Sequence, residues 1–235
     1  KENDRLSLIT FHSSAEQLFS LRCVSENNMT MFNEVIESLV DKGSTNINSG
    51  IHLAMDIIKT RKYKNPITSV FLLSDGRDTT NSSFYVSKKI QKTIQEVKTL
   101  DSFTIHSFGF GAKHDADLMR EIARFRGGNF YYISELKTID ECFVDAIGLL
   151  FSVILKDVVI KVKVNNEGFL NDMRICKTFG DMWRSSEEKE KIIHTIYLQM
   201  FSIGMKKDYI CQLNLPPIKK QLDANEKQLI FVEAE

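Results

Sequence analysis

The chain of 235 residues carries 31 lysines and arginines against 31 aspartates and glutamates, and 43% of its residues are hydrophobic. The zero net charge and the absence of a long Lys/Arg run exclude a protein that binds nucleic acid by neutralising phosphates, and the apolar content excludes a disordered chain. No run of about 18 apolar residues occurs, so the sequence predicts no membrane-spanning helix.

Strand-like and helix-like patterns alternate through the first two thirds of the chain. Leu6 to Phe11 is an apolar, β-branched run that predicts a strand, and residues 17–24 predict a second strand at an edge. Apolar residues at helical spacing predict helices over 28–40 and 47–58, the first ending before Gly43. The pattern then continues with a strand at 70–73, a helix at 86–97, a strand at 103–108, a helix at 118–125, a strand at 130–133 and a helix at 136–150.

The run Val70 to Leu73 is apolar at every position, which is typical of a parallel strand covered by helices on both faces. The alternation of strands and helices along residues 1–151 favours a doubly wound α/β domain with a mostly parallel sheet over this range. After residue 152 the helical spacing disappears. Strand-like runs at 158–164, 192–201, 209–215 and 228–233 predict a second, smaller antiparallel β domain over residues 152–235.

Two polar loops stand where a doubly wound sheet binds its ligands, outside the carboxyl ends of the strands. One is Gly43-Ser44-Thr45-Asn46, before a predicted helix, and the other is Ser74-Asp75-Gly76-Arg77-Asp78, after the all-apolar strand. Their hydroxyl and carboxylate oxygens are ligands that suit a hard cation such as Mg²⁺.

Four segments in this order resemble the von Willebrand factor A domain. They are Asp4 to Phe11, Gly43 to Ile47 with Gly50, Ile51 and Ala54, Phe71 to Gly76, and Ile105 to Gly111. The resemblance covers residues 1–151 and implies a non-enzymatic module that binds another protein. It also implies a metal-ion-dependent adhesion site, in which a partner's Asp or Glu completes the coordination of a divalent cation. Thr45 and Asp75 match metal ligands of that site, and Ser44, Asn46, Gly76, Arg77 and Asp78 surround them as expected partner contacts.

The family's first motif, Asp-x-Ser-x-Ser, does not occur in residues 1–235. By analogy with the family, the strand that bears it lies between the strand at Leu6 and the strand at Val70. Its absence would leave unpaired backbone on two buried strands, which is costly. We therefore expect a longer parent protein, or another chain, to supply this strand. We also expect Mg²⁺ to be a cofactor of the longer parent and to bind residues 1–235 weakly or not at all.

The segment Ile203 to Cys211, leading to Pro216-Pro217, resembles the β domain that follows the A domain in intracellular proteins such as plant RING-type ubiquitin ligases. The alternative function is therefore substrate recruitment by a ubiquitin ligase whose RING module lies outside this chain. The four cysteines form no Cys-x-x-Cys pair, which argues against a zinc site. They favour reduced, buried thiols in an intracellular, cytoplasmic protein, with two disulfides as the alternative.

Simpler interpretations compete with the site assignments. Thr45 could cap the helix that starts near Ile47, and Asp75 could shape its turn through the Asp-Gly step. His106, in a predicted strand, is expected to be structural. A hydrolase using Asp75, with Ser74 and His106 as a nominal triad, is the third hypothesis, although Gly-x-Ser-x-Gly is absent.

Overall fold

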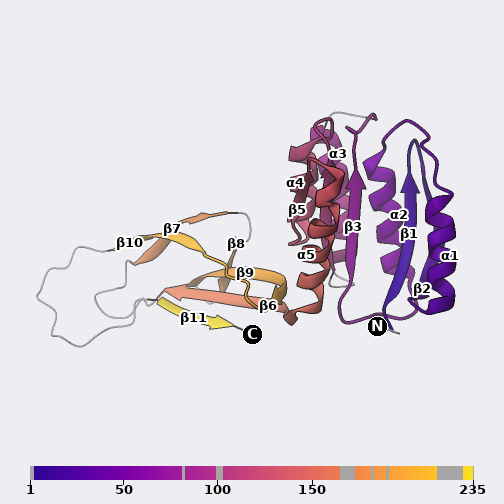
Figure 1. The fold of residues 1–235 in the computed structure, drawn as a ribbon. Helices are drawn as coiled ribbons and strands as arrows, with labels where there is room; N and C mark the ends of the chain where they lie inside the picture. Colours follow the sequence, from indigo (N-terminus) through magenta and orange to yellow (C-terminus); the bar gives the residue numbers. More distant parts are fainter. Residues whose placement is uncertain are drawn as a thin grey trace, which may run out of the picture. The chain divides into compact units, whose positions relative to one another are not determined.

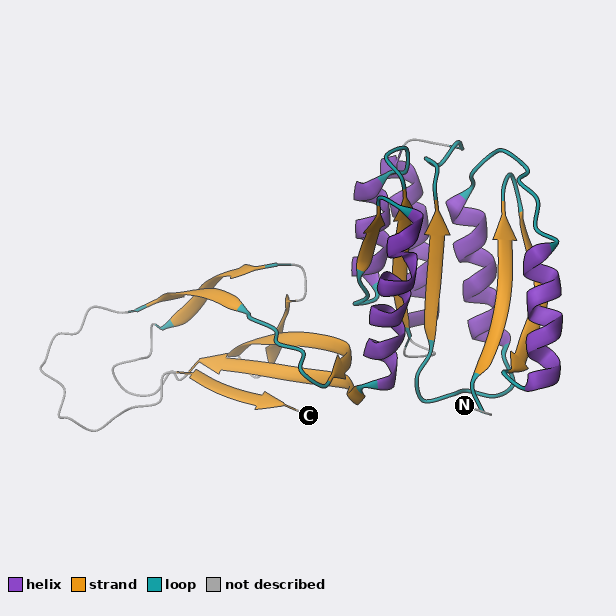
Figure 2. Ribbon diagram, in the orientation of Figure 1, coloured by secondary structure: helices purple, strands orange, loops and turns teal. Residues whose placement is uncertain are grey.

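A computed structural model describes residues 3–80, 83–98, 103–164, 173–180, 183–188, 191–215 and 230–234. The chain divides into two compact units, Lys1–Phe151 and Ser152–Glu235. All described helices belong to the first unit, and the second consists of strands (Figures 1 and 2). The predicted fold class, a doubly wound α/β unit followed by an antiparallel β unit, is confirmed.

The first unit contains two separate sheets. In one, β1 (Arg5–Phe11) pairs antiparallel with β2 (Ala15–Cys23), and in the other β3 (Ser69–Ser74), β4 (Thr104–Phe110) and β5 (Phe130–Ile133) pair in parallel in that order. Helices flank the strands, as Figure 2 shows. They are α1 (Glu26–Glu37), α2 (Ile47–Thr60), α3 (Ser83–Lys98), α4 (Ala116–Phe125) and α5 (Ile139–Phe151), with a 3-10 turn at Leu136–Thr138 before α5.

The neighbouring edges of the two sheets are open among the described residues. There, β1 is hydrogen-bonded only to β2, and β3 only to β4. Burial follows this pairing, because β4, which has a neighbour on each side, is buried from Thr104 to Gly109. On β3, by contrast, Leu73 is 41% exposed, although the strand is apolar throughout. An apolar strand of this composition is normally covered on both sides.

One hydrophobic core nevertheless joins both sheets. It contains buried side chains of α2, α3, α4, β3 and β4, and Ile9 and Phe11 of β1 pack against it. The contact between α2 and β1 is tight, because a Cβ added to Gly50 would lie 2.8 Å from the Phe11 ring. At the other end of β1, the Arg5 guanidinium donates hydrogen bonds to Tyr63 O at 2.6 Å and Asn65 Oδ1 at 2.7 Å, on the loop that leads to β3.

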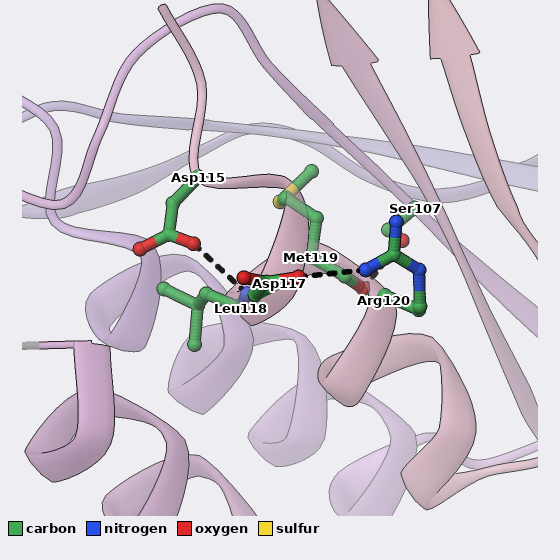
Figure 3. Close-up of polar contacts among 6 residues, drawn as sticks. All are labelled: Ser107, Asp115, Asp117, Leu118, Met119 and Arg120. Atoms are coloured by element: carbon green, nitrogen blue, oxygen red, sulfur yellow. Dashed lines mark hydrogen bonds and ion pairs between the residues drawn. The ribbon is translucent and has the colours of Figure 1, made fainter.

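Local hydrogen bonds fix α4 on the parallel sheet, as Figure 3 shows. Asp115 Oδ1 accepts a hydrogen bond from Leu118 N at 3.0 Å and so caps the helix. The buried Ser107 hydroxyl of β4 donates to Met119 O at 2.7 Å. On the outer side, Arg120 lies 2.7 Å from Asp117, an exposed pair of small energetic value.

Two expectations for this unit were wrong. The first helix ends at Glu37 rather than continuing to Val40, and Ser38 forms its C-cap. Beyond it, Leu39 and Val40 are 44% and 73% exposed, so these apolar side chains have no packing surface that would extend the helix. The last helix starts at Ile139 rather than 136, because Leu136 lies in the 3-10 turn and is 80% exposed.

The second unit is entirely antiparallel. One sheet has the order β11-β6-β9-β8, and the other pairs β10 with β7. Its small core is built around Trp183, Ile196, Val162 and Ile175. Its strands are β6 (Val153–Val164), β7 (Arg174–Phe179), β8 (Trp183–Glu188), β9 (Lys191–Ser202), β10 (Ile210–Asn214) and β11 (Ile230–Ala234). Pro216 and Pro217 and the predicted strand start at 228 lie outside the described residues.

All four cysteines are free thiols. The disulfide alternative therefore has no support in the structure. The expected burial was also wrong, because Cys23 and Cys176 are exposed and Cys142 and Cys211 are half-buried. The cysteines therefore carry no functional argument.

Candidate functional site

The two polar loops singled out in the sequence lie against each other. Three hydrogen bonds join Thr45 to Thr79, 34 residues later: Thr79 N and Thr79 Oγ1 donate to Thr45 O at 2.8 and 3.1 Å, and Thr45 N donates to Thr79 Oγ1 at 3.2 Å. A Cβ added to Gly76 would lie 3.0 Å from Thr45 Oγ1. We call residues 44–46 and 75–78 together the loop edge.

The N-terminus of α2 organises this edge. Asn46 is the N-cap, since its Oδ1 accepts from Ser49 N at 3.0 Å, and its Nδ2 donates to Ser13 O at 3.1 Å in the β1–β2 turn. Asp78 Oδ2 accepts from Ile47 N at 2.8 Å, so a residue of the β3 loop satisfies the first amide of the helix. Carboxylates also interact favourably with a helix N-terminus.

Asp78 and Asn46 thus use their side-chain oxygens inside the protein. Besides Ile47, Asp78 binds Thr80 through Oδ1, which accepts from the Thr80 amide at 2.9 Å and from its hydroxyl at 2.6 Å. These two expected partner contacts act in the structure as supports of the loops. Ser44, Asp75 and Arg77 are exposed, and Thr45 and Gly76 are half-buried.

The simpler interpretations of Thr45 and Asp75 are not what the structure shows. The helix cap is Asn46 rather than Thr45. The turn after β3 is closed by the Ser74 hydroxyl, which donates to Gly76 O at 3.2 Å, rather than by Asp75. Neither Thr45 Oγ1 nor the Asp75 carboxylate has a hydrogen-bond partner within the described part of the chain, so both oxygens are available to a ligand.

Thr45 and Asp75 supply a hydroxyl and one carboxylate, whereas Mg²⁺ prefers near-octahedral oxygen coordination and retains water. Among the described residues, no group of three or more His, Cys, Asp or Glu side chains could hold a metal ion. The loop edge therefore fits only part of a metal site. What it offers directly is an exposed surface of hydroxyl, carboxylate and guanidinium groups on loops held by hydrogen bonds.

His106 has a structural environment, as the sequence suggests. It is 4% exposed, and its Nδ1 accepts from Asn129 N at 3.2 Å. Burial lowers the pKa of His106 to about 4, against the opposing effect of the Asp145 carboxylate. The neighbouring Tyr131 hydroxyl donates to Asp145 Oδ2 at 2.8 Å. Because Ser74 bonds to Gly76 and His106 bonds to Asn129, the structure does not assemble the nominal triad.

Sequence reasoning missed Thr79, which joins the two loops. The Asp-x-Thr spacing at 78–80 is a recognisable signal for the local turn that Asp78 forms with Thr80. No local pattern indicates that Thr79 pairs with Thr45, because that contact depends on α2 and β3 packing against a common core.

The family model of the von Willebrand factor type A domain matches residues 1–144 of this chain. Among curated relatives, the probable E3 ubiquitin-protein ligase WAVH2 of Arabidopsis thaliana is 30% identical over 83 residues, which are 33% of this chain and 12% of that protein. The uncharacterized protein YfbK of Escherichia coli is 24% identical over 166 residues, 70% of this chain and 28% of its own length. The chain therefore spans less than a third of either relative.

A solved von Willebrand factor type A structure from Catenulispora acidiphila covers 100% of this chain and 54% of its own, with a TM-score of 0.73 and 16% identity. At that identity the likeness shows the fold alone. No helix in the described residues is long and apolar enough to cross a membrane.

Proposed function

Because the chain belongs to the von Willebrand factor type A domain family, whose members are generally protein-interaction modules, we propose that it binds a partner protein through the loop edge. The single observation that supports this site is the pairing of two loops by Thr45 and Thr79, which leaves Thr45 Oγ1 and Asp75 available at the surface. Loops supported in this way lose little conformational freedom on binding, which favours affinity.

We further propose that Thr45 and Asp75 are Mg²⁺ ligands in a longer parent protein and that residues 1–235 alone bind the ion weakly or not at all. An Asp or Glu of the partner and a family-type acidic motif supplied from outside this chain would complete the coordination. The metal would then link two carboxylates that otherwise repel each other. Isothermal titration of Mg²⁺ into the longer protein and into its Thr45→Ala variant tests the metal. Identical heats for both proteins would contradict it.

Partner binding is tested with an affinity capture from the source cell, quantified by mass spectrometry. We expect a defined protein to be enriched on the wild type and lost on the Asp75→Ala/Arg77→Ala variant. The matched control is Asp56→Ala/Lys59→Ala, which likewise removes one acidic and one basic side chain from exposed positions, toward the other end of α2. Equal enrichment on all three proteins would remove the loop edge as the binding site.

The similarity to WAVH2 favours a second candidate, the recruitment of substrates to a ubiquitin ligase whose RING module lies outside this chain. It predicts that the captured partner is ubiquitinated in a reconstituted assay containing the longer protein. A longer protein without a RING or comparable zinc module would contradict it.

We also propose that residues 1–151 and 152–235 are separate domains and that an additional strand completes the sheet between β1 and β3. The open edges of these two strands and the 41% exposure of Leu73 support the additional strand. Hydrogen exchange of the β3 amides in the chain alone and in a longer protein would test it, with equally fast exchange in both as the contradicting result.

A further inference from the structure

A groove between α2 and α3 lies beside the loop edge and is lined by three lysines. It encloses about 460 Å³, and we call it the lysine groove. Its lining residues are Asn46, Asn48, Thr80, Tyr85, Val86, Lys88, Lys89 and Lys92. None of these residues is acidic, in a chain whose net charge is zero.

The three lysines share one face of α3. Positions 88 and 92 are four residues apart and 89 and 92 are three apart, which places their side chains next to one another. The opposite face of α3, with Val86, Ile90 and Ile94, is buried in the core and fixes the orientation of the helix. The lysines therefore concentrate positive charge on a rigid element.

The lysines have no carboxylate partner among the described residues. The Lys88 ammonium lies 4.3 Å from the centre of the Phe84 ring, a cation–π contact that leaves its charge unneutralised. Lys89 and Asp56 both line an adjoining hollow. The Asp56 carboxylate, however, contacts the ring of His52 at 3.1 Å rather than Lys89. Three unneutralised ammonium groups at one groove favour an anionic ligand.

The lining of the groove adds a second requirement. Tyr85 lines the groove and is 68% exposed, and the neighbouring Phe84 is 62% exposed. A small anion such as phosphate can pair with the lysines but leaves this aromatic surface uncovered, whereas a peptide can cover it and also present several carboxylates to the lysines. The lysine groove thus combines an exposed aromatic surface with a demand for negative charge.

We propose that the lysine groove binds an extended acidic peptide segment, whose carboxylates pair with Lys88, Lys89 and Lys92 and whose apolar atoms pack against the Tyr85 ring. Asn46 lies in both the groove and the loop edge. A partner on the loop edge could therefore continue into the groove, although neither site requires the other. The groove requires no metal.

The test uses fluorescence anisotropy with a fluorescein-labelled ten-residue peptide that contains five glutamates. The same peptide with glutamines in their place is the control. We expect the Glu peptide to bind at low salt, with an affinity that falls as salt rises, and the Gln peptide to bind at least tenfold more weakly. Charge reversal in Lys88→Glu/Lys92→Glu should weaken binding about tenfold or more.

Matched variants separate the groove from general surface charge. Lys59→Glu/Lys62→Glu makes the same charge change elsewhere on the unit and should alter affinity less than about twofold. Lys88→Gln/Lys92→Gln, which adds no repulsion, should give an intermediate loss, and circular dichroism should show an unchanged fold for every variant. Equal losses in the two charge-reversed variants would overturn the proposal, as would equal binding of both peptides or no binding.

Tyr85→Ala tests the peptide specifically. It removes the exposed ring and should weaken the Glu peptide several-fold while leaving competition by tripolyphosphate unchanged. If tripolyphosphate binds and the Glu peptide does not, the groove is a small-anion site and the proposal is wrong. Because Asp75→Ala/Arg77→Ala leaves all groove residues in place, it should not change Glu-peptide binding, so failure of the loop-edge function and failure of this proposal can be told apart.

Discussion

At the residue scale, the oxygens of the loop edge divide into two groups. Asp78 and Asn46 form hydrogen bonds that hold the loops, whereas Thr45 Oγ1 and Asp75 face no partner in the described residues. The first group gives the edge its shape, and we propose that the second gives it its capacity to bind. Substitutions in the first group should therefore lower the stability of the protein, whereas substitutions in the second should weaken binding and leave stability unchanged.

Asp78→Ala should destabilise the first unit by about 1–2 kcal/mol, because it removes the acceptor of the first α2 amide. Asp75→Ala should change stability by less than about 0.5 kcal/mol, since it alters an exposed loop position. Urea unfolding followed by circular dichroism measures both. A loss in Asp75→Ala as large as that in Asp78→Ala would contradict this division.

Acid should destabilise the protein through His106. Burial lowers the pKa of His106 from its ordinary value of 6.5 to about 4 in the folded state. The unfolded chain therefore takes up the proton first, so stability is complete above pH 6.5 and falls as the pH drops toward 4. Between pH 7.5 and 5 the wild type should lose about 2 kcal/mol more than His106→Asn. Urea titrations at the two pH values measure this difference. If the wild type and His106→Asn lost the same stability between them, the buried neutral imidazole would be contradicted.

The pattern placed the two polar loops at one edge of the sheet, and the family resemblance assigned Thr45 and Asp75 within them. Neither could assign the helix cap to Asn46 or find Thr79. Those roles depend on which of several adjacent polar groups reaches a given amide, and that choice is made by tertiary packing.

At the element scale, apolar spacing located the strands and the buried helices of the first unit well, but it did not predict β7 or β8 of the second unit. It also failed at the end of α1 and at the start of α5, where Leu39, Val40 and Leu136 continue the pattern but are exposed. Periodicity reports which side chains could face a core. Whether a core surface exists at that point is decided by neighbouring elements that the local sequence does not describe.

The turn between α4 and β5 should tolerate no side chain at Gly128. A Cβ there would lie 2.0 Å from the backbone oxygen of Ile105, so Gly128→Ala should destabilise the unit by about 3 kcal/mol or more. Gly148 of α5 has no atom within 4 Å of an added Cβ, and Gly148→Ala should stabilise by about 0.5–1 kcal/mol. Thermal unfolding compares the two, and a tolerated Gly128→Ala would contradict the close approach.

At the scale of the whole molecule, the order of strands and helices was sufficient to predict the α/β unit and the change to β structure after it. That order alone could not predict that β1–β2 and β3–β4–β5 form two sheets, because pairing between distant strands is a property of the assembled unit. The family resemblance, by contrast, led us to expect unpaired edges on the strands at Leu6 and Val70. The neutral net charge likewise concealed the local excess of lysine on α3.

If the two units are separate domains, they should unfold separately. The single tryptophan, Trp183, is in the core of the second unit, and all described helices are in the first. Tryptophan fluorescence and helical circular dichroism should therefore give different urea midpoints. Coincident transitions would show one cooperative unit instead.

The central claim is that the loop edge contacts a partner protein, and site-specific photocrosslinking tests it most directly. A benzophenone amino acid is placed at Arg77 of the loop edge or, as a control, at Lys62, and each protein is irradiated in extracts of its source cell. Position 77 should give a discrete crosslinked protein that is absent at position 62 and is reduced by Asp75→Ala. Crosslinking at position 62 alone, or equally at both positions, would contradict the account.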